Sequence, residues 1–400
     1  MQLVEQHIIK PTHKDYKILD ELLYKSKNLY NATLYAVRQH YFNEKTYISY
    51  YKLQPIFQHE NQVDYVALPR KVSQQTMKMV DQNFRSFFGS LKATKLKGKK
   101  KSIPHYLNRD NGRYEAIFTN QAISLPMLEK KGYLQLSGTD IHVSTRLKSN
   151  QINQVRVVPH CGYISIEIIY NVTEKTLMND NNRYGGIDIG VNNLAVLTSN
   201  IDGFQPTIYN GKLLKSYNHY YNKKLARLKS ILETRNNKKS SKRIRKLTVK
   251  RNNKVKDYLH KTSTKIVKQI SQQTINTLIV GKNDGWKQAT NIGKKNNQNF
   301  VQIPHATFIN MLEYKCRLAG IQCIAQEESY TSKCDFLCEE SIEKHESYMG
   351  KRVSRGVFQS GTGKMLNADV NGSYNILRKC KPTAFIVNGV QAVVVQPRVV

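Results

Sequence analysis

The sequence predicts an α/β protein joined to an all-β barrel, and three observations lead to that prediction. The stretch from Tyr184 to Leu197 has the pattern of a strand, a tight Gly/Asn turn and a second strand. From Tyr106 to about Val172, apolar and polar side chains alternate with a period of two, as in antiparallel strands. A block with helical periodicity, Thr12 to Leu91, precedes that β region and follows an opening strand. Because strands flank the helical block on both sides, we expect it to be inserted into one barrel.

The N-terminal part of the chain supplies the helical block. Met1 to Lys10 predicts a strand that Pro11 ends, and two helices are expected, one from Thr12 and one from about Lys71 to Leu91. We therefore assign residues 1–11 and 102–180 to the barrel and residues 12–101 to the helical lobe. Aromatic residues between the two helices have two interpretations, stacking on bases or packing in the core; they are Tyr47, Tyr50, Tyr51 and Phe57.

The charge of the chain indicates the kind of partner. Its 400 residues carry a formal net charge of +34, spread along the sequence, so a polyanion such as nucleic acid is expected. A membrane surface is the alternative, but no apolar run approaches the roughly 18 residues of a spanning helix. The opening residues lack the pattern of a signal peptide, and six Cys without a regular framework fit a reducing compartment.

Two stretches concentrate the basic residues. Residues 91–101 form a connector, and residues 212–269 predict two long helices with apolar stripes and basic outer faces. A solvated linker and a solvated hairpin are the alternatives to contacts with a phosphate backbone. The candidate nucleic-acid contacts are Lys97, Lys99, Lys100, Lys101, Arg227, Lys242, Arg243, Arg245, Lys246 and Arg251.

Three carboxylates occupy unusual places. Asp188 lies in an apolar strand, where burial is costly unless the group is paired, hydrogen-bonded or bound to a cation. It is either a turn-capping or salt-bridged residue or a metal ligand. Glu327 and Glu328 follow a predicted strand, Ile321 to Gln326, and are otherwise simply exposed. Asp369 stands at the mouth of a helix, where an N-cap role is the alternative.

Taken together, these stretches resemble a known family. Gly-Ile-Asp-Ile-Gly-Val-Asn-Asn-Leu-Ala at 186–195, Tyr-Thr-Ser-Lys-Cys at 330–334 and Asp-Val-Asn-Gly-Ser-Tyr-Asn-Ile at 369–376 look like TnpB, the RNA-guided nuclease of insertion sequences and a relative of type V CRISPR effectors. The resemblance extends over essentially the whole chain. It implies a wedge barrel with an inserted recognition lobe, followed by a RuvC-like, ribonuclease-H-like nuclease domain over residues 181–400.

The resemblance also implies a metal-dependent active site. In such a core, three carboxylates hold two divalent ions about 4 Å apart, and Mg²⁺ suits them. By position, Asp188 supplies the first carboxylate and Asp369 the last. The family usually places a Glu directly after the strand that here ends Leu278-Ile279-Val280, but this chain has Gly281. Some relatives instead carry a Glu just before the Tyr-Thr-Ser motif, so Glu328 is our choice for the middle ligand. Glu327 is the reserve, since adjacent strand residues point oppositely, and Asp284 is a weaker candidate.

A second departure from the family concerns zinc. TnpB proteins commonly carry two Cys pairs that form a four-Cys site. Here Cys334 and Cys338 form one pair, His345 is nearby, and no second pair follows before Asp369. We therefore expect a degenerate zinc-finger-like insertion at residues 330–366 without metal, with zinc bound at Cys334 and Cys338 as the alternative.

The sequence thus predicts a prokaryotic, cytoplasmic, RNA-guided DNA endonuclease, nucleoid-associated when bound. It would act as a single copy on a guide RNA derived from the element and cut DNA beside a short flanking motif. Two alternatives from other classes stay open. One is a nuclease-inactive, RNA-guided DNA-binding repressor, and the other is a guide-independent transposase or resolvase. A basic RNA-binding protein without catalysis would explain the charge but not the placement of the carboxylates.

Overall fold

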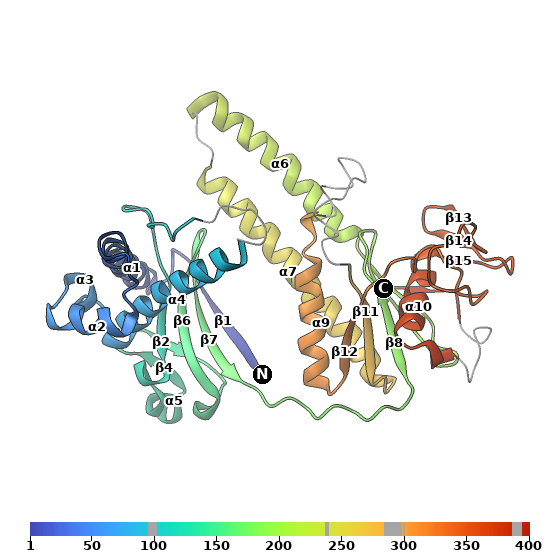
Figure 1. The fold of residues 1–400 in the computed structure, drawn as a ribbon, viewed down its shortest axis with the longest axis horizontal. Coiled ribbons are helices and arrows are strands. Elements are labelled where there is room, and N and C mark those ends of the chain that lie inside the picture. Colours follow the sequence, from blue (N-terminus) through green and yellow to red (C-terminus); the bar gives the residue numbers. More distant parts are fainter. Residues whose placement is uncertain (95–101, 237–239, 284–297, 299–300, 386–393) are drawn as a thin grey trace. The chain divides into compact units, whose positions relative to one another are not determined.

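The computed structural model describes residues 1–94, 102–236, 240–283, 298, 301–385 and 394–400. The chain forms two compact units, Met1–Val172 and Thr173–Val400 (Figure 1). The boundary that we predicted, between residues 180 and 181, lies inside the second unit.

The first unit contains two antiparallel sheets. The larger sheet has the strand order β1-β7-β6-β2, and β1 pairs with β7 from Gln2 opposite Asn171 to Ile9 opposite Ile164. The smaller sheet has the order β3-β4-β5. Among the described strands, no pairing closes either sheet on itself, so the barrel stays a prediction. The bounds are β1 (Gln2–Ile9), β2 (Ala116–Thr119), β3 (Ile123–Ser124), β4 (Tyr133–Leu136), β5 (His142–Ser144), β6 (Ile152–His160) and β7 (Tyr163–Asn171).

Helices stand in sequence between two strands of the larger sheet. They are α1 (Tyr16–Glu44), α2 (Tyr50–His59), α3 (Val63–Val66) and α4 (Arg70–Thr94). The helix predicted from Thr12 begins four residues later, and α2 and α3 were not predicted. Three short elements follow β2: η1 (Asn120–Ala122), α5 (Leu125–Lys131) and η2 (Ser149–Gln151).

The aromatic residues of this region mostly serve the core. The Tyr47 hydroxyl donates to Asp81 Oδ1 over 2.5 Å, and its ring packs edge-on against Phe88. Phe57 is buried in the same core. Tyr51, by contrast, is 72% exposed, so it alone of the four predicted stacking residues presents most of its ring to solvent.

The second unit is built on one six-stranded sheet with the order β12-β11-β8-β9-β10-β16. β12, β11 and β8 are parallel, β9 runs antiparallel to both β8 and β10, and β16 is parallel to β10. The bounds are β8 (Tyr184–Asp188), β9 (Asn193–Ser199), β10 (Thr207–Asn210), β11 (Thr277–Gly281), β12 (Gln322–Gln326) and β16 (Arg398–Val399). These bounds confirm the strand–turn–strand predicted around Asp188.

Helices cover both faces of this sheet. Ile187, Leu278 and Val280 pack against α7 (Lys242–Gln272) and α9 (His305–Ala319). Tyr184 and Ile279 pack on the opposite side against α10 (Ala368–Cys380). This alternation follows from the period of two in a strand, and it places Asp188 on the α10 side.

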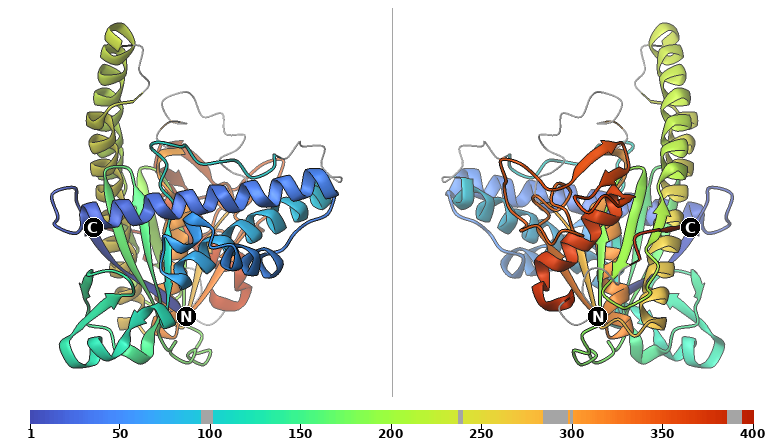
Figure 2. Two further views of the ribbon diagram at one scale, coloured as in Figure 1. Left: turned by 90° about the vertical axis from the view of Figure 1, so that its left-hand side faces the viewer. Right: turned by 90° about the vertical axis from the view of Figure 1, so that its right-hand side faces the viewer.

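α6 (Lys212–Asn236) runs beside α7 as a long hairpin (Figure 2). A small antiparallel sheet, β13 (Lys351–Ser354), β14 (Val357–Gln359) and β15 (Met365–Asn367), precedes α10, and η3 (Pro382–Phe385) follows it.

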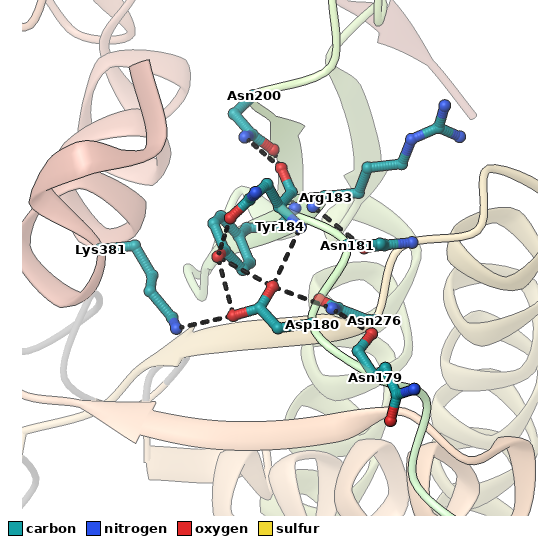
Figure 3. Close-up of polar contacts among 9 residues, drawn as sticks. Asn179, Asp180, Asn181, Arg183, Tyr184, Asn200, Asn276 and Lys381 are labelled. Atoms are coloured by element: carbon teal, nitrogen blue, oxygen red, sulfur yellow. Dashed lines mark hydrogen bonds and ion pairs between the residues drawn. The ribbon is translucent and has the colours of Figure 1, made fainter. Parts of the chain in front are cut away.

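A polar cluster fixes the start of β8 (Figure 3). The Asp180 carboxylate accepts hydrogen bonds from the Tyr184 hydroxyl at 2.9 Å and from Asn276 Nδ2 at 3.1 Å, and it pairs with Lys381 at 3.5 Å. These bonds, led by the one from Asn276, lower the pKa of Asp180 to about 2. The cluster ties the segment before β8 to β11 and α10, and so sets where β8 begins.

Candidate active site

Asp188 is the last residue of β8 and lies against the N-terminal part of α10. It pairs with Val196 of β9. Its Oδ2 lies 2.9 Å from the position that a Cβ of residue 372 would occupy. A side chain at Gly372 would therefore push against the carboxylate. Glycine at this position lets a strand-end carboxylate lie directly on a helix.

Glycine also allows α10 to approach β8. A Cβ on Gly186 would lie 2.5 Å from the carbonyl oxygen of Ser373. The Ser373 hydroxyl donates to the Gly186 carbonyl at 2.9 Å, so the helix and strand are hydrogen-bonded where they are closest. This contact holds the first turns of α10, and with them Asp369, near the end of β8.

Asp369 lies in the first turn of α10 but does not cap the helix. The N-cap is Asn367, whose side-chain oxygen accepts from the backbone N–H groups of Asp369 at 2.9 Å and Val370 at 3.4 Å. The N-cap alternative for Asp369 is therefore wrong. Its carboxylate instead accepts a hydrogen bond from Asn193 Nδ2 at 2.7 Å, which anchors it beside the turn between β8 and β9.

Glu328 fills the space that Gly281 leaves open. Its Oε2 lies 2.5 Å from where a Cβ of residue 281 would be. Asn283 holds it there twice, because Asn283 Nδ2 donates to Glu328 Oε1 at 3.0 Å and the Glu328 backbone N–H donates to Asn283 Oδ1 at 3.2 Å. The structure thus brings a carboxylate from beyond β12 to the end of β11, where the family usually has its own Glu.

Glu327 points elsewhere. Its carboxylate pairs with Lys379 at 2.7 Å and accepts from the backbone N–H of Ser329 at 2.8 Å and the Ser329 hydroxyl at 2.7 Å. These bonds, led by Lys379, lower the pKa of Glu327 to about 2. Asp284, the weaker candidate, lies outside the described residues.

The three carboxylates influence one another electrostatically. Burial raises the pKa of Asp188 well above its usual range, and the negative charges of Asp369 and Glu328 raise it further. Arg352 is the cation that opposes this effect. Burial, followed by the charge of Glu327, raises the pKa of Glu328 to about 7. Asp188 therefore needs a nearby positive charge to ionise beside Asp369 and Glu328.

A divalent cation would supply that counter-charge. The donor set consists of carboxylate oxygens, which is what Mg²⁺ prefers, and the accumulated negative charge at Asp188 fits such an ion. In the described part of the chain, no three Asp, Glu, His or Cys side chains converge on a single ion position.

In the insertion at residues 330–366, each predicted metal ligand contacts a different protein group. Cys334 Sγ contacts the Glu343 carbonyl oxygen at 3.6 Å, Cys338 Sγ contacts Ser360 Oγ at 3.6 Å, and His345 Nε2 lies 2.8 Å from the Ser341 carbonyl oxygen.

Two buried carboxylates that the sequence did not single out organise this insertion. Asp335 accepts from the backbone N–H groups of Leu337 at 3.0 Å and Gly361 at 2.7 Å. Glu340 accepts from those of Asp335 at 2.7 Å and Met349 at 2.9 Å. The Cys338 backbone N–H also donates to Asp335, at 3.4 Å, so together the two carboxylates join five backbone positions of the insertion.

The predicted nucleic-acid contacts fall into three groups. Lys97, Lys99, Lys100 and Lys101 lie outside the described residues. Arg251 is engaged internally, because its guanidinium donates to Asn218 Oδ1 at 2.8 Å and to the Gln302 carbonyl oxygen at 2.6 Å. The remaining five are exposed on the α6–α7 hairpin: Arg227, Lys242, Arg243, Arg245 and Lys246.

Comparisons with known proteins agree with this architecture. A family model described as "Probable transposase" (OrfB_IS605) matches residues 167–287, and one described as "Cas12f1-like, TNB domain" matches residues 305–376. The chain is 25% identical, over 77% of its length and 74% of the relative's, to the protein named "Putative RNA-guided DNA endonuclease InsQ" of Escherichia coli (strain K12). A solved complex of Cas12f1 with guide RNA and target DNA superposes with a TM-score of 0.55 at 17% identity, covering 90% of this chain and 82% of that one.

The similarity to the Cas12f1 structure concerns the fold alone. The six-stranded mixed sheet with carboxylates at its strand ends and at the mouth of α10 therefore has the fold of the Cas12f-type effectors. The chain is TnpB-like, as its three motifs predicted. No helix in the described part of the chain is long and apolar enough to cross a membrane.

Proposed function

We propose that this protein is an RNA-guided DNA endonuclease of a transposable element and that Asp188, Glu328 and Asp369 hold Mg²⁺. The observation that carries the proposal is the Glu328 carboxylate in the space opened by Gly281, within electrostatic reach of Asp188. Glycine at residue 281 removes the usual ligand, and the same glycine makes room for another. The relative InsQ, named as an RNA-guided DNA endonuclease, supports the same activity.

The chain's own residues prepare the site for the metal. When bound, Mg²⁺ activates water and stabilises the leaving oxygen of the phosphodiester. Asn283 fixes the direction of the Glu328 carboxylate, and Asn193 does the same for Asp369. Asp188 is held against α10 by the close approach at Gly186 and Gly372. Preorganised ligands of this kind avoid reorganisation when substrate arrives.

The other parts of the proposal concern the nucleic acids. The exposed basic residues of the hairpin support contacts with a phosphate backbone, and the guide would carry the sequence specificity. We assign the sheets of the first unit and its inserted helices to the roles of wedge barrel and recognition lobe, which hold the guide RNA and read the flanking motif. The protein would act as a single copy on that RNA.

The insertion is proposed to be held by carboxylates rather than by zinc. Asp335 and Glu340 bond backbone N–H groups on both sides of the loop, which is the kind of connection that a metal would otherwise provide. Metal analysis of protein purified without added zinc tests this proposal. One equivalent of zinc that disappears in a Cys334→Ser variant would contradict it.

A ligand exchange between positions 281 and 328 tests the nuclease proposal. The protein, purified with its co-expressed RNA, is assayed on a plasmid that carries a guide-matched site, with Mg²⁺ and with EDTA. Cutting should require Mg²⁺, the matched site and Asp188. Glu328→Gln should abolish cutting, whereas Glu327→Gln should keep it, because Glu327 pairs with Lys379 instead.

The decisive variant combines two changes. Glu328→Gly removes the carboxylate beside residue 281, and Gly281→Glu then places one at the family's usual position. The new Cβ would also lie 2.6 Å from Ile376 Cδ1, the end of a side chain that can rotate away. The double variant should recover part of the cutting that Glu328→Gly alone loses. Gly281→Glu alone should be inactive, since its Cβ would meet the Glu328 carboxylate at 2.5 Å. Wild-type cutting by Glu328→Gln would refute the assignment, and guide-dependent binding by the wild type without cutting would establish the repressor instead.

A further inference from the structure

A groove on the helical hairpin gathers tyrosines and lysines at one place. It lies between α6 and α7 and encloses a cavity of about 350 Å³, within the range of about 300–1,000 Å³ that is typical of ligand pockets. Its lining residues are Ser216, Tyr217, Tyr220, Tyr221, Leu247, Lys250, Arg251 and Lys254. No carboxylate is among these described lining residues, so the groove is both aromatic and cationic.

Helical spacing brings these side chains together. Tyr217, Tyr220 and Tyr221 are three and four residues apart, and therefore lie on one face of α6. Lys250 and Lys254 are four residues apart, and face the tyrosines from α7. Lys254 Nζ lies 4.6 Å from the centre of the Tyr217 ring.

Some of the lining groups are already occupied, which separates structural residues from those available to a ligand. Arg251 is bonded to Asn218 and Gln302, and Tyr221 shares a hydrogen bond of 3.1 Å with Thr248. Tyr220 is 59% exposed, and Lys224 Nζ lies 5.9 Å from the centre of its ring, so a base that stacks on Tyr220 would have to share the ring with Lys224 or displace it. A ligand would meet the ring of Tyr220 together with the ammonium groups of Lys250 and Lys254.

We infer that this groove binds one unstacked nucleotide of a single-stranded nucleic acid, with its base on Tyr220 and its phosphate between Lys250 and Lys254. An aromatic ring offers a stacking surface to any base, and lysines bind phosphate as point charges. The combination of both within one cavity distinguishes this site from the basic outer faces of the hairpin, which offer charge alone. The inference deepens the proposed function, since it rests on a nucleic-acid partner, and it adds a site that binds an unpaired base.

The test measures binding without cleavage. The full chain, freed of co-purified nucleic acid by high salt, is titrated in EDTA against fluorescently labelled decamers of uridylate RNA, thymidylate DNA and an abasic chain with the same phosphates. Tyr220→Leu should weaken binding of the uridylate decamer about tenfold, because stacking is lost. Tyr220→Phe should retain it. Tyr220→Leu should leave the affinity for the abasic chain unchanged.

Matched variants separate stacking from charge. Lys254→Ala should weaken binding of both the uridylate and the abasic decamers and lower the salt dependence by about one unit of slope. Leu177→Ala removes a side chain of similar exposure, 53%, from the segment before β8, outside the groove, and should leave both affinities unchanged. If Tyr220→Leu loses as much affinity for the thymidylate DNA as for the uridylate RNA, the site accepts a nucleotide of either nucleic acid. A loss of affinity confined to the uridylate RNA would identify RNA as the source of the nucleotide.

Two results would overturn the site. In one, Tyr220→Leu binds the uridylate decamer like the wild type. In the other, Tyr220→Leu weakens binding of the abasic chain as much as binding of the uridylate decamer, which would mean that the site contributes charge alone. Because the assay contains no Mg²⁺, its outcome is independent of cutting: base-dependent binding by a protein that never cuts would leave the nucleotide site standing and remove the nuclease.

Discussion

Two pairs of carboxylates in the second unit differ in their hydrogen-bond donors: Asp335 and Glu340 in the insertion, and Asp188 and Glu328 at the six-stranded sheet. In the insertion, Asp335 and Glu340 are 0% and 5% exposed, and they accept three and two backbone N–H hydrogen bonds, respectively. At the end of the six-stranded sheet, Glu328 has the side-chain donor Asn283, and no hydrogen bond to the Asp188 carboxylate is found among the described residues. The acids of the insertion accept hydrogen bonds from the protein itself, whereas those of the sheet are the ones for which we propose a bound ion.

The largest expected effect separates the two pairs by activity. Asp188→Asn should reduce plasmid cutting by about a thousandfold or more, since a metal ligand contributes several kcal/mol to transition-state stabilisation. It should leave the melting temperature unchanged or raise it, because it removes a charge that opposes its neighbours. Cleavage assays and thermal melts of the same preparation check both parts. A large loss of stability would mean that Asp188 is a structural residue instead.

Added Mg²⁺ should sharpen the same contrast. An ion that binds only the folded state stabilises it by about 2.7 kcal/mol at a hundred times its dissociation constant. The melting temperature of the wild type should therefore rise with Mg²⁺, and Asp188→Asn should remove most of that rise. An Asp335→Asn variant, in contrast, should respond to Mg²⁺ like the wild type. Equal responses of all three proteins would place the ion somewhere other than the sheet.

A substitution in the insertion should lower stability rather than the response to Mg²⁺. Asp335→Ala leaves the backbone N–H groups of Leu337, Cys338 and Gly361 without their acceptor, and each unsatisfied buried donor costs about 1–3 kcal/mol. Chemical unfolding should show a loss of about 3 kcal/mol or more, while the residual folded protein keeps its response to Mg²⁺. Asp335→Asn should lose less, because its amide oxygen still accepts. If Asp335→Ala were as stable as the wild type, the carboxylates would not hold the insertion.

Sequence patterns predicted the sheet carboxylates better than those of the insertion. Asp188 and Asp369 belong to local motifs. The choice of Glu328 relied on the resemblance to relatives with a Glu before the Tyr-Thr-Ser motif, and the alternation of strand side chains implied that only one of Glu327 and Glu328 faces the site. That Glu328 fills the space at Gly281 depends on the parallel pairing of β11 with β12, which no local pattern specifies.

Residues whose internal partners the sequence did not indicate share a different cause. Glu340 has no sequence signal because an acidic loop residue looks the same whether it is exposed or bonded to backbone N–H groups. Arg251 was predicted to contact nucleic acid because it lies in a basic helix, but its partner Gln302 is 51 residues away in sequence. Only the packed structure shows that its guanidinium is already used.

The smallest expected effect concerns a carboxylate intermediate between the two pairs. Asp180 has protein donors, as in the insertion, but its side chain is 53% exposed. Its folded pKa of about 2 lies below the ordinary value of 3.8, so its contribution is present above about pH 4 and is lost as the pH falls toward 2. Exposure limits that contribution to roughly 0.5 kcal/mol.

Asp180→Asn should therefore lower stability slightly at pH 7 and flatten the pH dependence of unfolding between pH 4 and 2, as measured by urea unfolding at each pH. A difference from the wild type that is unchanged across this range would show that the carboxylate charge contributes nothing, and that the hydrogen bonds of Figure 3 act without it.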